Sequence, residues 1–305
     1  RKKALERNEK LFEIKAAQAI QTLELRMRDY VQILIGAKAF FVSSDTVSRK
    51  DWQKYYATLK LEENYPGIQG IGYAQVIRPQ EMPDHLNQIR AEGFTNYAVR
   101  PEGKRNLYTS IIYLEPFDER NQRAFGFDMF SDTTRRSAMQ MARDTRQPSL
   151  SGKVRLVQET GIDEQAGFLI YLPVYEDNVE PESIKDRQQL IKGFVYSPFR
   201  AKDLMMATLG SNFKDLDIEI YDGTNLEPES ILFNSDEILH YHGKEKRELS
   251  MLSTLSIGNH TWRIYSTAKP SFVRSADTEL PYFILLGGSI ISFLMFFIIW
   301  SLTNT

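Results

Sequence analysis

Two groups of residues in this sequence have the types and spacing to do chemistry. His240 and His242 are separated by one residue, so on a β-strand both imidazoles would project from the same side and could ligate a metal ion. Asp236 and Glu237 stand shortly before them, but no third ligand has a spacing that is typical of a metal site. A solvated histidine pair explains the same pattern, and we predict no metal here.

The second candidate is Asp128, whose carboxylate lies in the apolar run FGFDMF at 125–130. Strand alternation would place Phe127 on one face and Asp128 on the other. Burying an unpaired carboxylate is costly, so Asp128 needs a partner. One interpretation is a salt bridge to Arg135 or Arg136, or a helix-capping role. The other is that Asp128 accepts hydrogen bonds from a ligand donor in a small pocket.

Several function classes find no support in the sequence. It has no nucleophile elbow, Walker loop or HExxH motif, and Gly70-Ile71-Gly72 lacks the third glycine of a dinucleotide fingerprint. The chain has no cysteine, which excludes disulfides, thiolate nucleophiles and cysteine zinc sites. Its net charge of −2 gives no indication of a nucleic-acid partner. We therefore predict neither catalysis nor a cofactor in this fragment.

Residues 1–43 have the pattern of one long helix that would position the rest of the chain. Apolar or small residues recur at alternating spacings of four and three, the a/d pattern of a coiled coil. They are Ala16, Ile20, Leu23, Met27, Tyr30, Leu34, Ala37 and Phe41. This pattern predicts a stalk helix that pairs with its twin in a homodimer. A long helix packed on its own domain is the alternative.

The segments after the stalk predict an α+β fold in two parts. Short strand-like and helix-like runs alternate over 44–210, and a strand-then-turn pattern begins again after Gly210, so 211–275 would form a second, smaller unit. From Tyr282 to Leu302 there are 21 residues without a charge. About 20 apolar residues cross a bilayer as a helix, so 282–302 is predicted to be transmembrane.

The order of motifs between Phe125 and Tyr196 resembles the CHASE family, the extracytoplasmic ligand-binding part of receptor histidine kinases and diguanylate cyclases. The matching blocks are 125–130, 147–154, 167–175 and 191–196. The resemblance implies two stacked PAS-like units on a long helix, with the ligand in the membrane-distal unit. It also implies a periplasmic sensor in the inner membrane, whose output module is a histidine kinase or, next, a diguanylate cyclase.

The same resemblance implies a set of ligand-binding residues. Asp128 matches the family aspartate that contacts the ring of cytokinins, so a cytokinin-like or adenine-derived ligand is the hypothesis. Tyr171 stands where the plant receptors have a smaller threonine, and it would fill space that an isoprenoid-bearing purine needs. The remaining predicted residues either line the ligand or permit its close approach, with ordinary sheet core as the alternative for the last two: Leu150, Ser151, Gly193, Tyr73 and Leu172.

Two functions follow from these observations. The first is a membrane-anchored sensor that binds a small molecule outside the cytoplasm and relays the signal through a dimeric stalk. The second is a structural or protein-interaction ectodomain with a vestigial pocket. A pocket with room for a ring beside Asp128 favours the first, and a pocket filled by Tyr171 favours the second.

Overall fold

A computed structural model describes residues 2–65, 67–161, 163–176, 181–243, 247–272 and 280–303, with only the backbone of residues 2–4, 280–284 and 302. The described helices are α1 (Lys2–Val42), α2 (Arg49–Leu59), α3 (Leu61–Asn64), α4 (Met82–Ala91), α5 (Glu119–Gln122), α6 (Thr133–Thr145), α7 (Ile184–Leu190), α8 (Ala201–Leu209) and α10 (Leu280–Thr303). Three short 3₁₀ helices are η1 (Pro79–Glu81), η2 (Met129–Ser131) and η4 (Pro228–Ser230).

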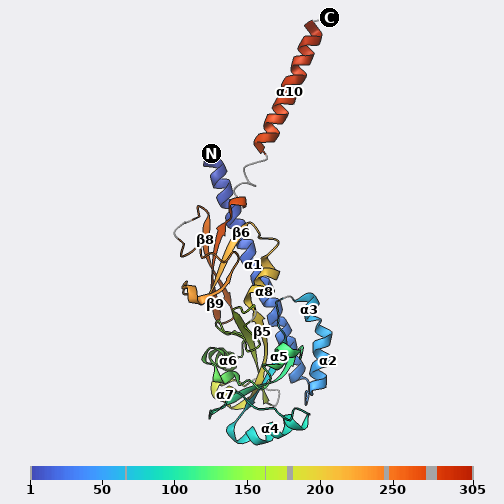
Figure 1. Ribbon diagram of the computed structural model, residues 1–305, viewed down its shortest axis with the longest axis vertical. Coiled ribbons are helices and arrows are strands. Elements are labelled where there is room, and N and C mark those ends of the chain that lie inside the picture. The colour runs from blue at the N-terminus through green and yellow to red at the C-terminus, as the bar shows by residue number, and fades with distance from the viewer. Residues whose placement is uncertain are drawn as a thin grey trace.

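The strands form two antiparallel sheets, which confirms the α+β class. The larger sheet has the order β2-β1-β5-β4-β3, from β1 (Ile71–Ile77), β2 (Tyr108–Glu115), β3 (Ser149–Leu150), β4 (Gly167–Tyr175) and β5 (Ile191–Arg200). The smaller has the order β7-β6-β9-β8, from β6 (Leu216–Asp222), β7 (Ile231–Asn234), β8 (Ser250–Ile257) and β9 (His260–Ala268). Figure 1 shows both sheets along one side of α1, with α8 near their junction.

Helix α1 buries the apolar stripe that the sequence predicted, but the stripe packs inside its own chain. Leu23, Met27 and Leu34 are at most 1% exposed and belong to the core that α1 shares with both sheets. Fully burying one such side chain contributes about 1.5–3 kcal/mol, so this packing fixes the helix on the sheets. The alternative, a long helix packed on its own domain, is therefore what the structure shows for seven of the eight stripe residues, while Ile20 is partly exposed. Pairing of the stalk with a twin helix stays a prediction.

Each face of the larger sheet is covered by different elements. One face packs on α1, and the other packs on η2 and α6, so strand β4 contacts both α1 and α6. We call these the α1 face and the α6 face. Because side chains alternate along a strand, neighbouring residues lie on opposite faces, for example Tyr171 on the α6 face and Leu172 on the α1 face.

Residues 125–130 do not form the strand that the alternation suggested. Gly126 adopts the left-handed φ of +80°, and an added Cβ there would lie 2.4 Å from the carbonyl oxygen of Ala98. Phe127 and Asp128 then make single bridges to Arg100 and Ser110 before η2 begins. The chain therefore turns at Gly126 and carries the Asp128 side chain inward over β2.

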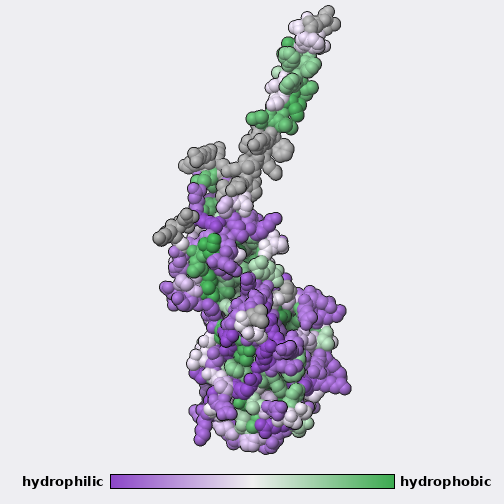
Figure 2. Space-filling model, in the orientation of Figure 1, coloured by the Kyte–Doolittle hydropathy of each residue, from purple (hydrophilic) through white to green (hydrophobic). Residues whose placement is uncertain are grey.

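Helix α10 coincides with the uncharged run of the sequence and projects away from the sheets (Figure 1). Its described large apolar side chains, from Leu285 to Trp300, are 53–73% exposed. Figure 2 shows it as a hydrophobic column beside a mostly hydrophilic body. Among the residues that the structure describes, no helix is both long and apolar enough to cross a membrane.

Candidate ligand-binding site

The α6 face holds Asp128 at the β2 edge of the sheet. Asp128 is fully buried, and its Oδ1 accepts hydrogen bonds from the backbone N–H groups of Thr109 at 2.8 Å and Phe130 at 3.1 Å. Its Oδ2 lies 3.4 Å from Nη1 of Arg105 and accepts no hydrogen bond from any described residue. Burial raises the pKa of Asp128, although these donors and the Arg105 charge oppose the effect.

Ser149, Tyr171 and Tyr196 form a row across β3, β4 and β5 on the same face. The two tyrosine rings are 6.3 Å apart, and both side chains are fully buried. The next strand presents Gly72, where a Cβ would approach the Tyr196 ring to 2.6 Å, so glycine makes room for that ring. The hydroxyls of all three row residues are buried and have no hydrogen-bond partner among the described residues.

Arg135 brings a positive charge to this row from the first turn of α6. The helix begins there because the Asp132 carboxylate accepts a hydrogen bond from the Arg135 N–H at 2.8 Å and caps it. Its guanidinium lies over the Phe127 ring, 5.5 Å from the centroid, and donates to the carbonyl oxygen of Arg155 at 2.7 Å. Burial raises the pKa of Tyr171 and of Tyr196, and the Arg135 charge acts in the opposite direction on both.

The α6 face thus combines polar groups of complementary character with four buried polar atoms that lack partners. These are Asp128 Oδ2 and the hydroxyls of Ser149, Tyr171 and Tyr196. Each such atom costs the fold about 1–3 kcal/mol when nothing satisfies it. These atoms do not meet at one point, because Ser149 lies on β3 at one edge of the five-stranded sheet and Asp128 lies beside β2 at the other edge. Tyr171 and Tyr196 lie on neighbouring strands near the Arg135 charge, and they are the pair that one molecule could contact together. The arrangement suits recognition of a small polar molecule.

Comparison with known proteins identifies the family. The sequence profile of the CHASE domain matches residues 45–233, more than half of the chain. This chain belongs to the CHASE family. The match confirms the resemblance found in the sequence, and it makes the protein a sensory domain of the extracytoplasmic type.

Two solved structures of chemoreceptor sensory domains are similar to this CHASE domain at very low sequence identity. The ligand-binding domain of the Pseudomonas aeruginosa PAO1 amino acid chemoreceptor PctC, in complex with GABA, is 8% identical with a TM-score of 0.50. The comparison covers 85% of this chain and 98% of that one. The periplasmic sensory domain of the Campylobacter jejuni chemoreceptor Tlp1 is 9% identical with a TM-score of 0.49, over 87% of this chain and 94% of that one. No curated protein sequence matches.

The CHASE fold separates the residues that the sequence grouped into one site. Asp128 and Tyr171 lie on the α6 face, whereas Leu150 and Leu172 lie in the core of the α1 face. Ser151 is used locally, because its hydroxyl accepts from the Leu169 N–H at 2.9 Å and donates to the Gly152 carbonyl oxygen at 2.8 Å.

The last two predicted residues, Tyr73 and Gly193, lie together on the α1 face. A Cβ added to Gly193 would come 2.3 Å from the Tyr73 hydroxyl, so this glycine permits the close approach of that tyrosine. The seven predicted residues therefore do not line one pocket.

The alternative interpretation of Asp128, a salt bridge to Arg135 or Arg136 or a helix-capping role, is right only in its second part. Asp128 caps η2 by accepting the Phe130 N–H, and it forms no salt bridge to either arginine. Arg135 pairs with Asp132 at 3.3 Å, and Arg136 donates to the Phe130 carbonyl oxygen at 2.8 Å. The cation beside Asp128 is Arg105, from the segment before β2. The sequence offered a signal for Tyr196, an aromatic residue on a glycine-bearing strand, but none for Arg105 or Ser149, because their roles depend on tertiary contacts.

A second polar chain lies beside the Asp128 region. Tyr97 joins His85 Nε2 at 2.8 Å and Ser110 Oγ at 2.7 Å, all three being buried. Burial lowers the pKa of His85 to about 4 and raises that of Tyr97 to about 12. Both side chains are therefore neutral at pH 7. The hydrogen-bonded row of His85, Tyr97 and Ser110 is thus an uncharged polar surface next to Asp128.

The predicted histidine pair does not converge on a metal. His242 Nε2 contacts the carbonyl oxygen of Leu226, whereas His240 Nε2 lies 2.8 Å from Asp236 and 3.6 Å from Asp217. By geometry, His240, Asp236 and Asp217 could together hold a metal ion. However, Arg247 at 2.8 Å and Lys269 at 3.1 Å already neutralise the buried Asp217 carboxylate, so the group is an ion-pair cluster.

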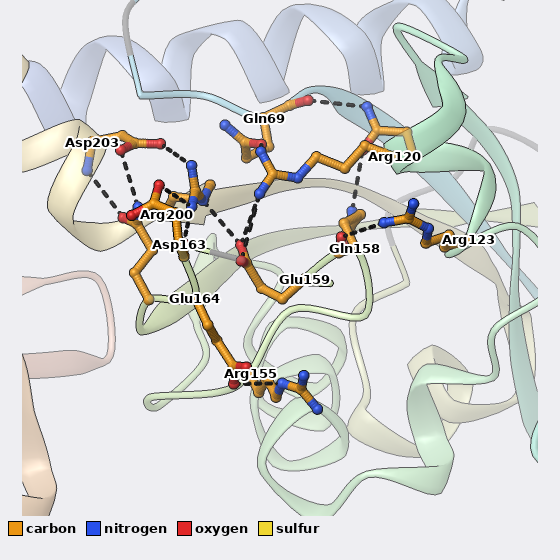
Figure 3. A network of polar contacts seen from close by, with 12 residues as sticks. Gln69, Arg120, Arg123, Arg155, Gln158, Glu159, Asp163, Glu164, Arg200 and Asp203 are labelled. Atoms are coloured by element: carbon orange, nitrogen blue, oxygen red, sulfur yellow. Dashed lines mark hydrogen bonds and ion pairs between the residues drawn. The ribbon is translucent and has the colours of Figure 1, made fainter. Parts of the chain in front are cut away.

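An arginine network fixes the connection between β3 and β4 of the CHASE domain. Figure 3 shows the Glu159 carboxylate between Arg200 and Arg120, at 2.9 and 3.4 Å. Arg200 also contacts Asp203 at 2.7 Å and Asp163 at 2.9 Å. Arg200 ends β5 immediately before α8. The network therefore ties the β3–β4 connection to α8, the helix that leads to the smaller sheet.

Proposed function

We propose that this CHASE domain binds a small polar molecule on the α6 face of its larger sheet and reports binding through α8 and α1. The observation that carries the proposal is the set of four buried polar atoms without partners around Asp128, Ser149, Tyr171 and Tyr196. A ligand that satisfied even part of this set would gain free energy that the empty fold lacks. The unit spanning 44–210 is then the ligand-binding one, and the unit spanning 211–275 is membrane-proximal, both PAS-like.

The side chains of the α6 face limit which kinds of ligand could bind there. Asp128 favours an N–H or ammonium group, and Arg135 with the two tyrosines favours an acceptor or a carboxylate. Because the Tyr171 ring occupies the middle of the face, a compact molecule fits better than a cytokinin with an isoprenoid tail. Adenine derivatives and small amino compounds are both of this kind, and GABA is the ligand in the PctC structure.

The experiment compares ligand-induced thermal shifts in matched tyrosine variants, with adenine derivatives and amino acids as the compounds. In Tyr171→Phe the removed hydroxyl has no partner, so the unliganded melting temperature should stay or rise, whereas the shift caused by a binding compound should fall. In Tyr175→Phe the hydroxyl already donates to the Arg143 carbonyl oxygen, so the unliganded melting temperature should fall and the shift should persist.

The alternative function is a protein-interaction ectodomain with a vestigial pocket. The complete burial of Tyr171 favours it, since the ring fills the predicted space. If none of the compounds shifts the melting temperature of the unmodified protein at millimolar concentration, this alternative replaces the sensor proposal.

The dimer, if mediated by α1, must use the surface that remains exposed. Leu11, Ile14, Leu25 and Ile35 are 41–52% exposed, and with Gln18 and Gln32 they continue an a/d spacing on the outer side of the helix. Ile14→Cys or Leu25→Cys should cross-link two chains in membranes, while the buried Leu23→Cys should not. Efficient cross-linking at Leu23 alone would contradict this interface.

The proposed membrane anchor is the run of 21 uncharged residues 282–302, and it is inferred from the sequence. Among the described residues, no helix is long and apolar enough to cross a membrane. With the anchor in the inner membrane, the sensory part lies in the periplasm and a histidine kinase or diguanylate cyclase follows. A reporter that works only in the cytoplasm should be inactive when fused at Ser211 and active when fused after Thr305. The opposite pattern would disprove this topology.

A further inference from the structure

A second cavity lies on the α1 face of the same sheet, at the far end of α1. It has a volume of about 180 Å³, opens to solvent, and is lined by the end of α1, the turn at 44–47, helix α4 and strands β1, β2 and β5. Pockets for drug-sized molecules span roughly 300–1,000 Å³, so this cavity suits a smaller, amino-acid-sized molecule. None of the residues placed on the α6 face lines it.

Tyr73 lines the cavity with its aromatic ring. The side chain is only 3% exposed, and its hydroxyl is buried without a hydrogen bond to any described residue. Its ring stacks on Phe41 at 4.2 Å, and the absent side chain of Gly193 leaves room for the hydroxyl. The tyrosine is therefore held in place, and its ring, not its buried hydroxyl, forms the wall that a molecule in the cavity would contact.

Two opposite charges stand at the rim of the cavity. Asp45 comes from the turn after α1 and Lys192 from β5, and both are exposed. Neither forms an ion pair with another described residue, so both charges are available to a ligand. Gln75 and Gln88 add carboxamide groups that can donate and accept. An ammonium group at Asp45 and a carboxylate at Lys192 would match this arrangement.

We propose that this cavity is a second ligand site, and that it takes a small zwitterion of the amino-acid class. The ammonium pairs with Asp45, the carboxylate pairs with Lys192, and the carboxamides of Gln75 and Gln88 bond the remaining polar atoms of the ligand. Because the site joins the turn after α1 to the sheet, an occupied cavity braces the end of the stalk helix. The site is separate from the α6 face and does not depend on it.

The test is isothermal titration of the whole chain with glycine, the ω-amino acids of three to five carbons and the common L-amino acids. We expect at least one of these zwitterions to bind, while the amine or carboxylic acid of matching length binds much more weakly. Asp45→Asn and Lys192→Gln should each weaken binding roughly tenfold. Tyr73→Phe removes only a buried hydroxyl that the ligand does not reach, so it should leave binding unchanged. Lys185→Gln, at an exposed lysine on α7, serves as the control and should change nothing.

The outcomes separate the two sites. Binding that is lost in Asp128→Asn but retained in Asp45→Asn and Lys192→Gln would place the ligand on the α6 face and overturn this proposal. Absence of binding by every zwitterion at millimolar concentration would also overturn it, whatever happens with adenine derivatives. Binding that survives Asp128→Asn and fails in the Asp45 and Lys192 variants would support the second site.

Discussion

Arg200→Met is expected to lower the free energy of unfolding by about 3–5 kcal/mol, the usual effect of removing one partner of a buried ion pair. The Glu159 side chain is fully buried, and Arg200 is its closest cation at 2.9 Å. In the variant, Glu159 would keep only the contacts to Arg120 at 3.4 and 3.5 Å. Urea unfolding of the whole chain measures the loss.

The matched control comes from the same network. Arg155 pairs with Glu164 at 2.5 Å (Figure 3). These side chains are 62% and 41% exposed. Solvent screens such a pair, so Arg155→Met should cost less than about 1 kcal/mol. Adding Glu159→Gln to Arg200→Met should recover part of the loss, because no buried charge is then left alone. Equal, small losses in Arg200→Met and Arg155→Met would show that burial does not matter here.

The second large effect is expected at Asp128, where two substitutions should differ. Asp128→Leu removes the acceptor of the buried Thr109 N–H and should destabilise the protein by about 1–3 kcal/mol. The Phe130 N–H suffers less, since it also donates to Thr109 Oγ1 at 3.0 Å. Asp128→Asn keeps an oxygen acceptor in the same place and should leave the fold close to its original stability.

The pH dependence of the same pair gives a further check. Burial raises the pKa of Asp128 in the folded protein above its ordinary value of 3.8. The folded state therefore holds this proton more tightly, and the Asp128 contribution to stability falls as pH rises from 3.8 through the raised pKa. Asp128→Asn carries no charge, so its stability relative to the original protein should increase over that window. A relative decrease would mean that the ionised carboxylate stabilises the fold.

The Asp128 variants also report on the function. If the ligand donates an N–H group to the carboxylate, Asp128→Asn should weaken binding by about 1–3 kcal/mol, the range for hydrogen bonds to charged groups. Titration calorimetry with a compound that shifts the melting temperature measures this directly. Unchanged affinity in a folded Asp128→Asn variant would remove Asp128 from the proposed site and leave it a structural residue.

The sequence by itself determined the long helix, the α+β class and the family. Local patterns suffice for these: the alternating spacing of Leu23, Met27 and Leu34 specifies one apolar stripe on a helix, and short strands between turns specify antiparallel pairing. The sequence also showed that Asp128 needs a partner, because an apolar run cannot solvate a carboxylate.

Only the tertiary structure decided what covers each surface. The a/d spacing of apolar residues does not reveal whether a twin helix or a sheet buries them. In this protein, the two sheets bury the stripe of α1. Because successive side chains of a strand point to opposite faces, Leu172 lies on the α1 face although its neighbour Tyr171 lies on the α6 face. The partner of Asp128 is Arg105 because the turn at Gly126 carries the carboxylate over β2, a contact between segments that no local spacing encodes.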